Sequence, residues 1–90
     1  TVNKLMQDIV MLYGKGYSNT AQKYCTAMAK YLFYIKQDNN SFLLFTKLSL
    51  KINGEIFANS PQNIKNSIIK DEDIKLLKEI VNNLKMRFKK

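Results

Sequence analysis

Residues 13–36 read YGKGYSNTAQKYCTAMAKYLFYIK, a stretch that predicts the end of one helix, a turn and a second helix. Gly14 and Gly16 are expected to stop the first helix, because glycine adopts the left-handed conformation in which helices often end. Ser18, Asn19 and Thr20 are residue types whose side-chain oxygens cap the free N–H groups of a following helix. The stretch therefore predicts a corner between two packed helices.

A capped helix start of this kind also attracts phosphate, because its free N–H groups and its dipole favour an anion. Lys15 and Lys23 stand on either side of the turn, and Lys30 recurs on the same expected face of the second helix. The corner is therefore a candidate site for DNA phosphates. The residues expected to contact DNA are Lys15, Ser18, Asn19, Thr20, Lys23, Lys30, Lys65 and Lys70.

Charge supports the same partner. The chain has 15 basic and 7 acidic residues among 90, a net charge of +8, and all its basic residues except Arg87 are lysine. Lysine is a compact charge suited to phosphate, and it is less suited than arginine to forked recognition of guanine. We expect contacts that position duplex DNA rather than read its sequence. The alternative is that the lysines only solvate the surface.

Catalytic and metal-binding patterns are missing from the sequence. The chain has no histidine and one cysteine, Cys25, which excludes a Cys–His nucleophile pair and a zinc site of the usual kind. Asp71, Glu72 and Asp73 are adjacent on an expected helix, so they point in different directions and are interpreted as an N-terminal cap. We expect no catalytic residue, cofactor, metal ion or small-molecule substrate, and we expect Cys25 to be a buried structural thiol.

The length and the hydrophobic content bound the class of protein. Ninety residues, 46 % of them hydrophobic, suit one small globular domain or a part of a larger protein. The chain does not begin with Met, so a fragment is expected. No apolar run approaches the roughly 18 residues that span a membrane, and no signal-peptide pattern is present. We expect no membrane contact and a cytoplasmic location, on nucleoid or host-cell DNA.

Hydrophobic periodicity predicts helices over residues 2–13, 20–36 and 71–90, and a linker or short helix over 62–70. The second of these is expected to end at Asp38, Asn39 and Asn40. Its apolar stripe is expected to consist of Ala21, Tyr24, Cys25, Met28, Leu32 and Ile35. The stripe of the last helix is expected to consist of Ile74, Leu77, Ile80 or Val81, Leu84 and Phe88.

Residues 41–58 are ambiguous. Phe42 to Leu48 favour a short helix, but from Leu48 to Ile52 apolar and polar residues alternate as in a strand. Asn53-Gly54 then forms a hairpin signal. We expect a short helix running into an extended arm, with a β-hairpin near residues 48–57 as the alternative. The predicted fold is mainly α, a bundle of three to five helices, divided into a helical domain (1–58), a connector (59–70) and a C-terminal helix (71–90).

The order of these pieces resembles the DNA-facing core-binding region of tyrosine recombinases, including phage integrases and Xer-type enzymes. In that family a Gly-x-Ser-x-x-Thr-like turn leads into an aromatic-rich helix, as residues 14–36 do here. A connector with an Asn-Pro-like element follows, which Ala58-Asn59-Ser60-Pro61 resembles with one extra residue. Residues 68–77 are similar to the segment that opens the catalytic domain, and the family's catalytic residues would lie beyond Lys90.

The resemblance implies a domain that holds duplex DNA, and self-associates on it, while a separate domain cuts and rejoins strands. Two alternatives stay open. One is a small helical adaptor, viral or plasmid-encoded, that contacts a protein partner through an apolar groove around Phe45 and Phe57. The other is a winged-helix regulator, with residues 18–36 in the DNA groove and residues 48–58 as the wing.

Overall fold

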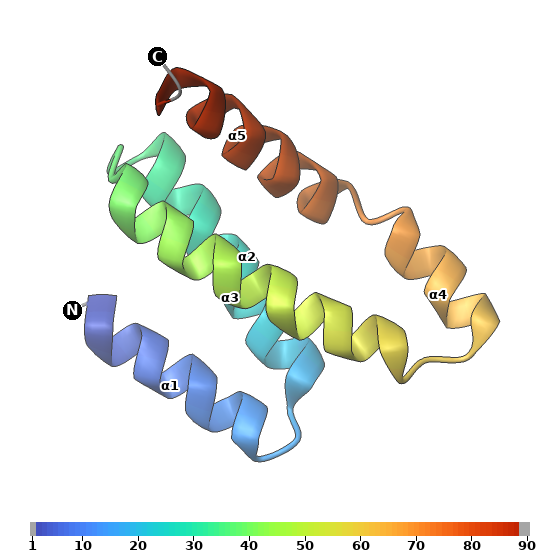
Figure 1. The fold of residues 1–90 in the computed structure, drawn as a ribbon. Coiled ribbons are helices and arrows are strands. Elements are labelled where there is room, and N and C mark those ends of the chain that lie inside the picture. Colours follow the sequence, from blue (N-terminus) through green and yellow to red (C-terminus); the bar gives the residue numbers. More distant parts are fainter. Residues whose placement is uncertain (1, 89–90) are drawn as a thin grey trace.

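The protein is described by a computed structural model over residues 2–88, and all regular structure in that range is helical (Figure 1). This confirms the predicted helical bundle. The predicted end of the last helix at residues 89 and 90 lies outside the described range. The helices are α1 (Val2–Gly14), α2 (Ser18–Tyr34), α3 (Asn39–Ala58), α4 (Gln62–Ile69) and α5 (Glu72–Phe88).

The antiparallel pair α2 and α3 forms the centre of the bundle. Figure 1 shows α1 along one side of this pair and α5 along the other, with α4 set apart beside the end of α3. Both α1 and α5 contact α2 and α3, and α4 contacts α3. No helix within residues 2–88 has both the length and the apolar character needed to cross a bilayer.

Three contacts fix the register of α2 against α3. The Gln22 side-chain amide donates to Asn53 Oδ1 over 3.2 Å, and the hydroxyls of Thr26 and Ser49 are 2.9 Å apart. Further along, the rings of Phe33 and Phe42 have centroids 5.1 Å apart. Moving toward the C-terminus of α2, the partner residue on α3 moves by the same number of positions toward the N-terminus of α3. One face of α2 therefore packs against α3 along the length of the helix.

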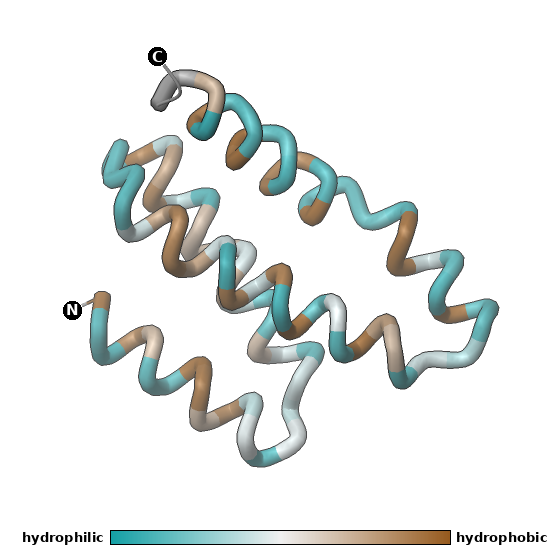
Figure 2. Tube along the Cα trace, viewed as in Figure 1, coloured by the Kyte–Doolittle hydropathy of each residue, from teal (hydrophilic) through white to brown (hydrophobic). Residues whose placement is uncertain are grey.

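All the larger helices contribute to one hydrophobic core. In Figure 2 the hydrophobic positions of α5 turn toward the α2–α3 pair and its hydrophilic positions turn outward. Leu77 and Leu84 of α5 are buried, as the predicted stripe of this helix requires. By contrast, α4 has no buried residue. The core residues are Ile9, Ala21, Cys25, Ala29, Leu32, Phe42, Phe45, Ile52, Leu77, Ile80 and Leu84.

The turn between α2 and α3 differs from the sequence prediction. Asp38 does not end the second helix, which stops at Tyr34; it is the N-cap of α3. The Asp38 carboxylate accepts hydrogen bonds from the Ser41 hydroxyl and the Ser41 backbone N–H, and these bonds lower the pKa of Asp38. Gln37 takes a positive φ of 53° and reverses the chain. In this sequence, an Asp followed three residues later by a Ser therefore marks the start of a helix rather than the end of one.

The expected extended arm or hairpin over residues 48–57 is wrong, because α3 runs without a break through Asn53-Gly54. The buried positions of α3 include Phe42, Phe45, Ser49 and Ile52, which recur at helical spacing. That helical stripe, packed against α2 and α5, prevails over the short alternation after Leu48. The wing of the winged-helix alternative is absent for the same reason.

Replacing Gly54 with alanine tests this helix directly. A Cβ at Gly54 would meet no atom within 4 Å, and the residue does not have a positive φ. Alanine is better than glycine in a helix interior by about 1 kcal/mol, so Gly54→Ala should raise the free energy of unfolding by about that amount. In a tight hairpin turn, which needs positive φ, the same change would destabilise the protein. Urea unfolding followed by circular dichroism measures the sign.

The matched control is the same substitution at Gly16, whose φ of +94° disfavours any residue with a Cβ. Gly16→Ala should lower stability while Gly54→Ala raises it. Destabilisation by both substitutions would mean that the middle of α3 is not a regular helix.

Candidate nucleic-acid interface

The helix start predicted to bind phosphate is built differently from the expectation. The capping position of α2 is Tyr17, and no side chain caps it. Ser18, Asn19 and Thr20 are instead the first three residues inside the helix, so their predicted capping role is wrong. The reason is the preceding turn: α1 ends at Gly14 as predicted, and Gly16 with its positive φ brings the chain back into helix two residues earlier than expected.

Because no side chain caps this helix, the N–H groups of its first turn keep their hydrogen-bonding capacity. The first four N–H groups of any helix have no acceptor within the helix. Here the earliest helical bond described at this end runs from the Ala21 N–H to the Tyr17 carbonyl over 2.9 Å. The backbone of Ser18, Asn19 and Thr20 can therefore donate to an anion even though the side chains do not cap.

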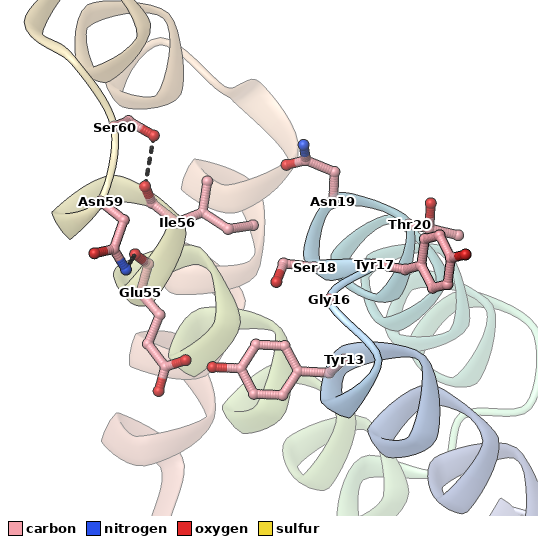
Figure 3. A pocket seen from close by; sticks show the side chains of 10 residues that line it. All are labelled: Tyr13, Gly16, Tyr17, Ser18, Asn19, Thr20, Glu55, Ile56, Asn59 and Ser60. Carbon is pink, nitrogen blue, oxygen red and sulfur yellow. Dashed lines mark hydrogen bonds between the residues drawn. The ribbon is translucent and has the colours of Figure 1, made fainter.

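A cleft of about 600 Å³ opens between this helix start and the end of α3. Figure 3 shows Tyr13 and Glu55 pointing toward each other across it, with Ser18 and Asn19 on its α2 side. The Glu55 carboxylate opposes phosphate binding deep in this cleft. Tyr17 and Thr20 also line this cleft, but in Figure 3 their side chains are drawn on the side of the α2 start away from Glu55. That outer side of α2 is the better place for a polyanion.

Lys23 and Lys30, which were predicted as phosphate contacts, lie along a second cleft of about 540 Å³ that also includes Asp71 and Asp73. Lys30 Nζ is 3.2 Å from Asp73 Oδ1, and both side chains are about half exposed, at 40 % and 53 %. The Asp71 carboxylate is occupied by the backbone N–H groups of Asp73 and Ile74, which confirms the predicted cap of the last helix. Lys30 is therefore partly neutralised, whereas Lys23 has no ion-pair partner among the side chains described.

The remaining predicted lysines are spread more widely. Lys15 is exposed in the turn just before α2, and Lys70 is exposed in the turn after α4. Lys65 lies on α4 with its Nζ 5.2 Å from the centre of the Phe57 ring, a cation–π contact. The structure thus brings Lys23 and Lys30 together on α2, with Lys15 in the turn before that helix, and it places Lys65 and Lys70 in and just after α4.

One group of residues on α2 was misassigned from the sequence. Tyr24 and Ile35 were placed on the buried stripe, but they are 58 % and 67 % exposed. Tyr17 and Tyr31 are exposed as well. The signal available in the sequence is the seven-residue spacing of Tyr17, Tyr24 and Tyr31, which puts the three rings on one side of a helix. Cys25, by contrast, is fully buried as predicted.

No known protein family, curated protein or solved structure matches this chain. The resemblance to tyrosine recombinases therefore stays a prediction. The main feature of the candidate site is the distribution of charged residues around α2. Between Ile9 and Gln37 the chain has four lysines and no acidic residue, and this segment contains the whole of α2.

Proposed function

We propose that this chain binds double-stranded DNA, mainly by phosphate contacts along the outer side of α2. The observation that carries the proposal is that α2 has no acidic residue and exposes Lys23, which is unpaired among the described side chains, while Lys15 lies just before its start. Asp71 and Asp73 share a cleft with Lys23 and Lys30, so the phosphates are expected on the open side of α2 rather than in that cleft. Backbone N–H groups at that start add donors suited to a phosphate. Lysine-based contacts of this kind position DNA with little sequence preference.

The resemblance to tyrosine recombinases supports the same partner. In that interpretation the chain holds the duplex and self-associates on it, and strand cleavage belongs to a separate domain. The absence of histidine from the sequence supports a non-catalytic role for this chain.

The adaptor alternative loses its main contact residue. Phe45, which was expected to face a protein partner, is fully buried in the core. Phe57 is only partly exposed, and Lys65 lies over its ring. Phe45 is therefore not available to a partner in this fold, whereas Phe57 lines a cleft of about 420 Å³ together with Leu50 and Ile69. The adaptor alternative is supported less than DNA binding, because one of its two expected contact residues is in the core.

The salt dependence of duplex binding tests the proposal. If about 4–5 phosphates are contacted, the log of the binding constant should fall with the log of salt concentration at a slope near −4. Lys23→Ala removes one contact and should make the slope shallower by about one, with equal weakening on unrelated sequences. Fluorescence anisotropy of labelled duplexes at several salt concentrations measures both quantities.

Lys51→Ala is the matched control, because Lys51 is an equally exposed lysine on α3. It should leave the slope unchanged, and neither substitution should shift the melting temperature appreciably. Equal effects of Lys23→Ala and Lys51→Ala would show that binding follows total charge rather than the α2 surface. No binding of the wild-type chain at low salt would refute the proposed function.

A further inference from the structure

Three exposed tyrosines, at the N-cap of α2 and within it, form a row. Tyr17, Tyr24 and Tyr31 are 59 %, 58 % and 42 % exposed, a high degree of exposure for large aromatic rings. Residues seven apart lie about two turns and 10.5 Å from each other along a helix, with a drift of only about 20°. The three rings therefore follow one another along a single stripe.

The stripe lies on the side of α2 that faces away from α3. The opposite side is held to α3 through Gln22 and Thr26, which bond to Asn53 and Ser49. Going around α2 by 100° per residue from that side, the tyrosine row falls almost diametrically opposite. The row is therefore the outermost line of the α2–α3 pair.

A row of lysines runs beside the tyrosines. Lys23 and Lys30 are also seven residues apart, and each precedes a tyrosine by one position, which places the two rows about 100° apart around the helix. The residues between the rows are Thr20 and Ala27, both small and exposed, and at the end of the helix Tyr34, which is 52 % exposed. Aromatic rings and lysines thus lie side by side along α2 in two pairs seven residues apart, Lys23 with Tyr24 and Lys30 with Tyr31.

We infer that this tyrosine–lysine face binds single-stranded DNA, with the rings of Tyr24 and Tyr31 stacked on unpaired bases and Lys23 and Lys30 near the phosphates. The inference rests on the proposed DNA binding and extends it to strands with unpaired bases. Exposed aromatic rings beside a positive strip are the elements by which proteins bind single strands without sequence preference. A paired base inside a duplex does not offer its face to such a ring.

Charge decides between this occupant and a protein partner. Lysine is depleted from the centres of protein–protein interfaces, whereas aromatic residues are enriched there. The present face has lysines alongside the rings at each repeat, α2 has no acidic residue, and the whole chain has a net charge of +8. Asp73 of α5 pairs with Lys30, so Lys23 is the stronger of the two positive charges. The exposed rings beside Lys23 and the excess of positive charge complement a polyanion with aromatic groups.

The chain itself provides a probe for stacking. It contains five tyrosines and no tryptophan, so its intrinsic emission reports tyrosines alone. Adding an unlabelled oligothymidylate of about 12 nucleotides, within the usual range of single-strand sites, should quench this emission. Anisotropy of the labelled oligonucleotide gives the affinity independently.

Tyr24→Leu should weaken binding of the oligothymidylate by about 5- to 150-fold, the range measured when one stacked ring is lost. Tyr24→Phe is the matched control: it keeps the ring and the affinity but removes one emitting tyrosine, so less quenching should be seen. Binding of the same duplex used above should change little in either variant.

The outcomes separate this inference from the proposed function. Tight duplex binding together with no oligothymidylate binding, or with equal affinities for Tyr24→Leu and Tyr24→Phe, would overturn the inference and leave the proposed function standing. Binding of the oligothymidylate with quenching, but no binding of the duplex, would support the inference and overturn the proposed duplex binding. A change in oligomeric state in Tyr24→Leu, seen by sedimentation and accompanied by unchanged single-strand affinity, would assign the face to self-association and overturn the inference.

Discussion

Replacing Phe45 with alanine should destabilise the folded domain by about 3–5 kcal/mol, the range for removing a fully buried phenylalanine. Phe45 has no exposed surface and belongs to the core that joins α1, α2, α3 and α5. Small domains have only about 5–15 kcal/mol of stability in total, so this loss is a large fraction of it. Thermal and urea unfolding followed by circular dichroism should show a melting temperature lower by more than about 12 °C.

The neighbouring Leu44 provides the control. Its side chain is 53 % exposed although it is adjacent to Phe45 in the sequence. Leu44→Ala should therefore change stability by about 0.5 kcal/mol or less. The reverse result, with Leu44→Ala damaging and Phe45→Ala mild, would show that α3 is rotated from its described position and that Phe45 is free to meet a partner.

The parts of the fold that local signals determine were predictable. Gly14 ends α1, and Asp71 caps α5 through two backbone N–H groups, both as expected. Helix periodicity placed Leu77 and Leu84 in the core correctly. These features depend on residues within about one helical turn of each other, so a single sequence contains the relevant information.

The middle of α3 was not predictable in the same way. Asn53-Gly54 is a strong turn signal in isolation, and nothing nearby cancels it. What decides is distant in sequence: the Gln22 amide bonds to Asn53, and the Thr26 hydroxyl bonds to Ser49 one turn earlier. Packing against α2 makes the helix continue, and a long-range contact of this kind leaves no local pattern.

The candidate site shows the same division. Lysine richness and the turn after α1 followed from the sequence, but α2 starts two residues earlier than expected. The pairing of Lys30 with Asp73 joins residues 43 apart and was not predictable from local signals. Tyr24 was misplaced because an aromatic ring counts as apolar in a periodicity argument, whether it faces the core or the solvent. The structure resolves the choice, because Ala21 and Cys25 already fill the adjacent core side of α2.

Raising the pH above 9 should destabilise the protein through Cys25. Burial of this fully enclosed thiol raises its pKa from 9.0 to about 12. Below pH 9 the thiol is protonated in both the folded and unfolded states, so its contribution to stability is fully present. Between pH 9 and about 12 the unfolded chain releases this proton and the folded chain retains it. The free energy of unfolding should then fall by up to about 1.4 kcal/mol per pH unit.

Lysines and tyrosines also titrate in this range, so the effect of Cys25 must be isolated with a variant. Cys25→Ala keeps a small apolar residue between Ala21 and Ala29 on the core side of α2 and removes the titrating group. Urea unfolding of both proteins under reducing conditions, from pH 8 to pH 11, gives two curves. The wild-type curve should fall by about 2–3 kcal/mol more than the variant curve over this range, because two pH units above 9 each contribute about 1.4 kcal/mol. Parallel curves, or rapid modification of Cys25 by a thiol reagent in the native protein at neutral pH, would mean that the thiol reaches solvent and that the packing of α2 against its neighbours is looser than described.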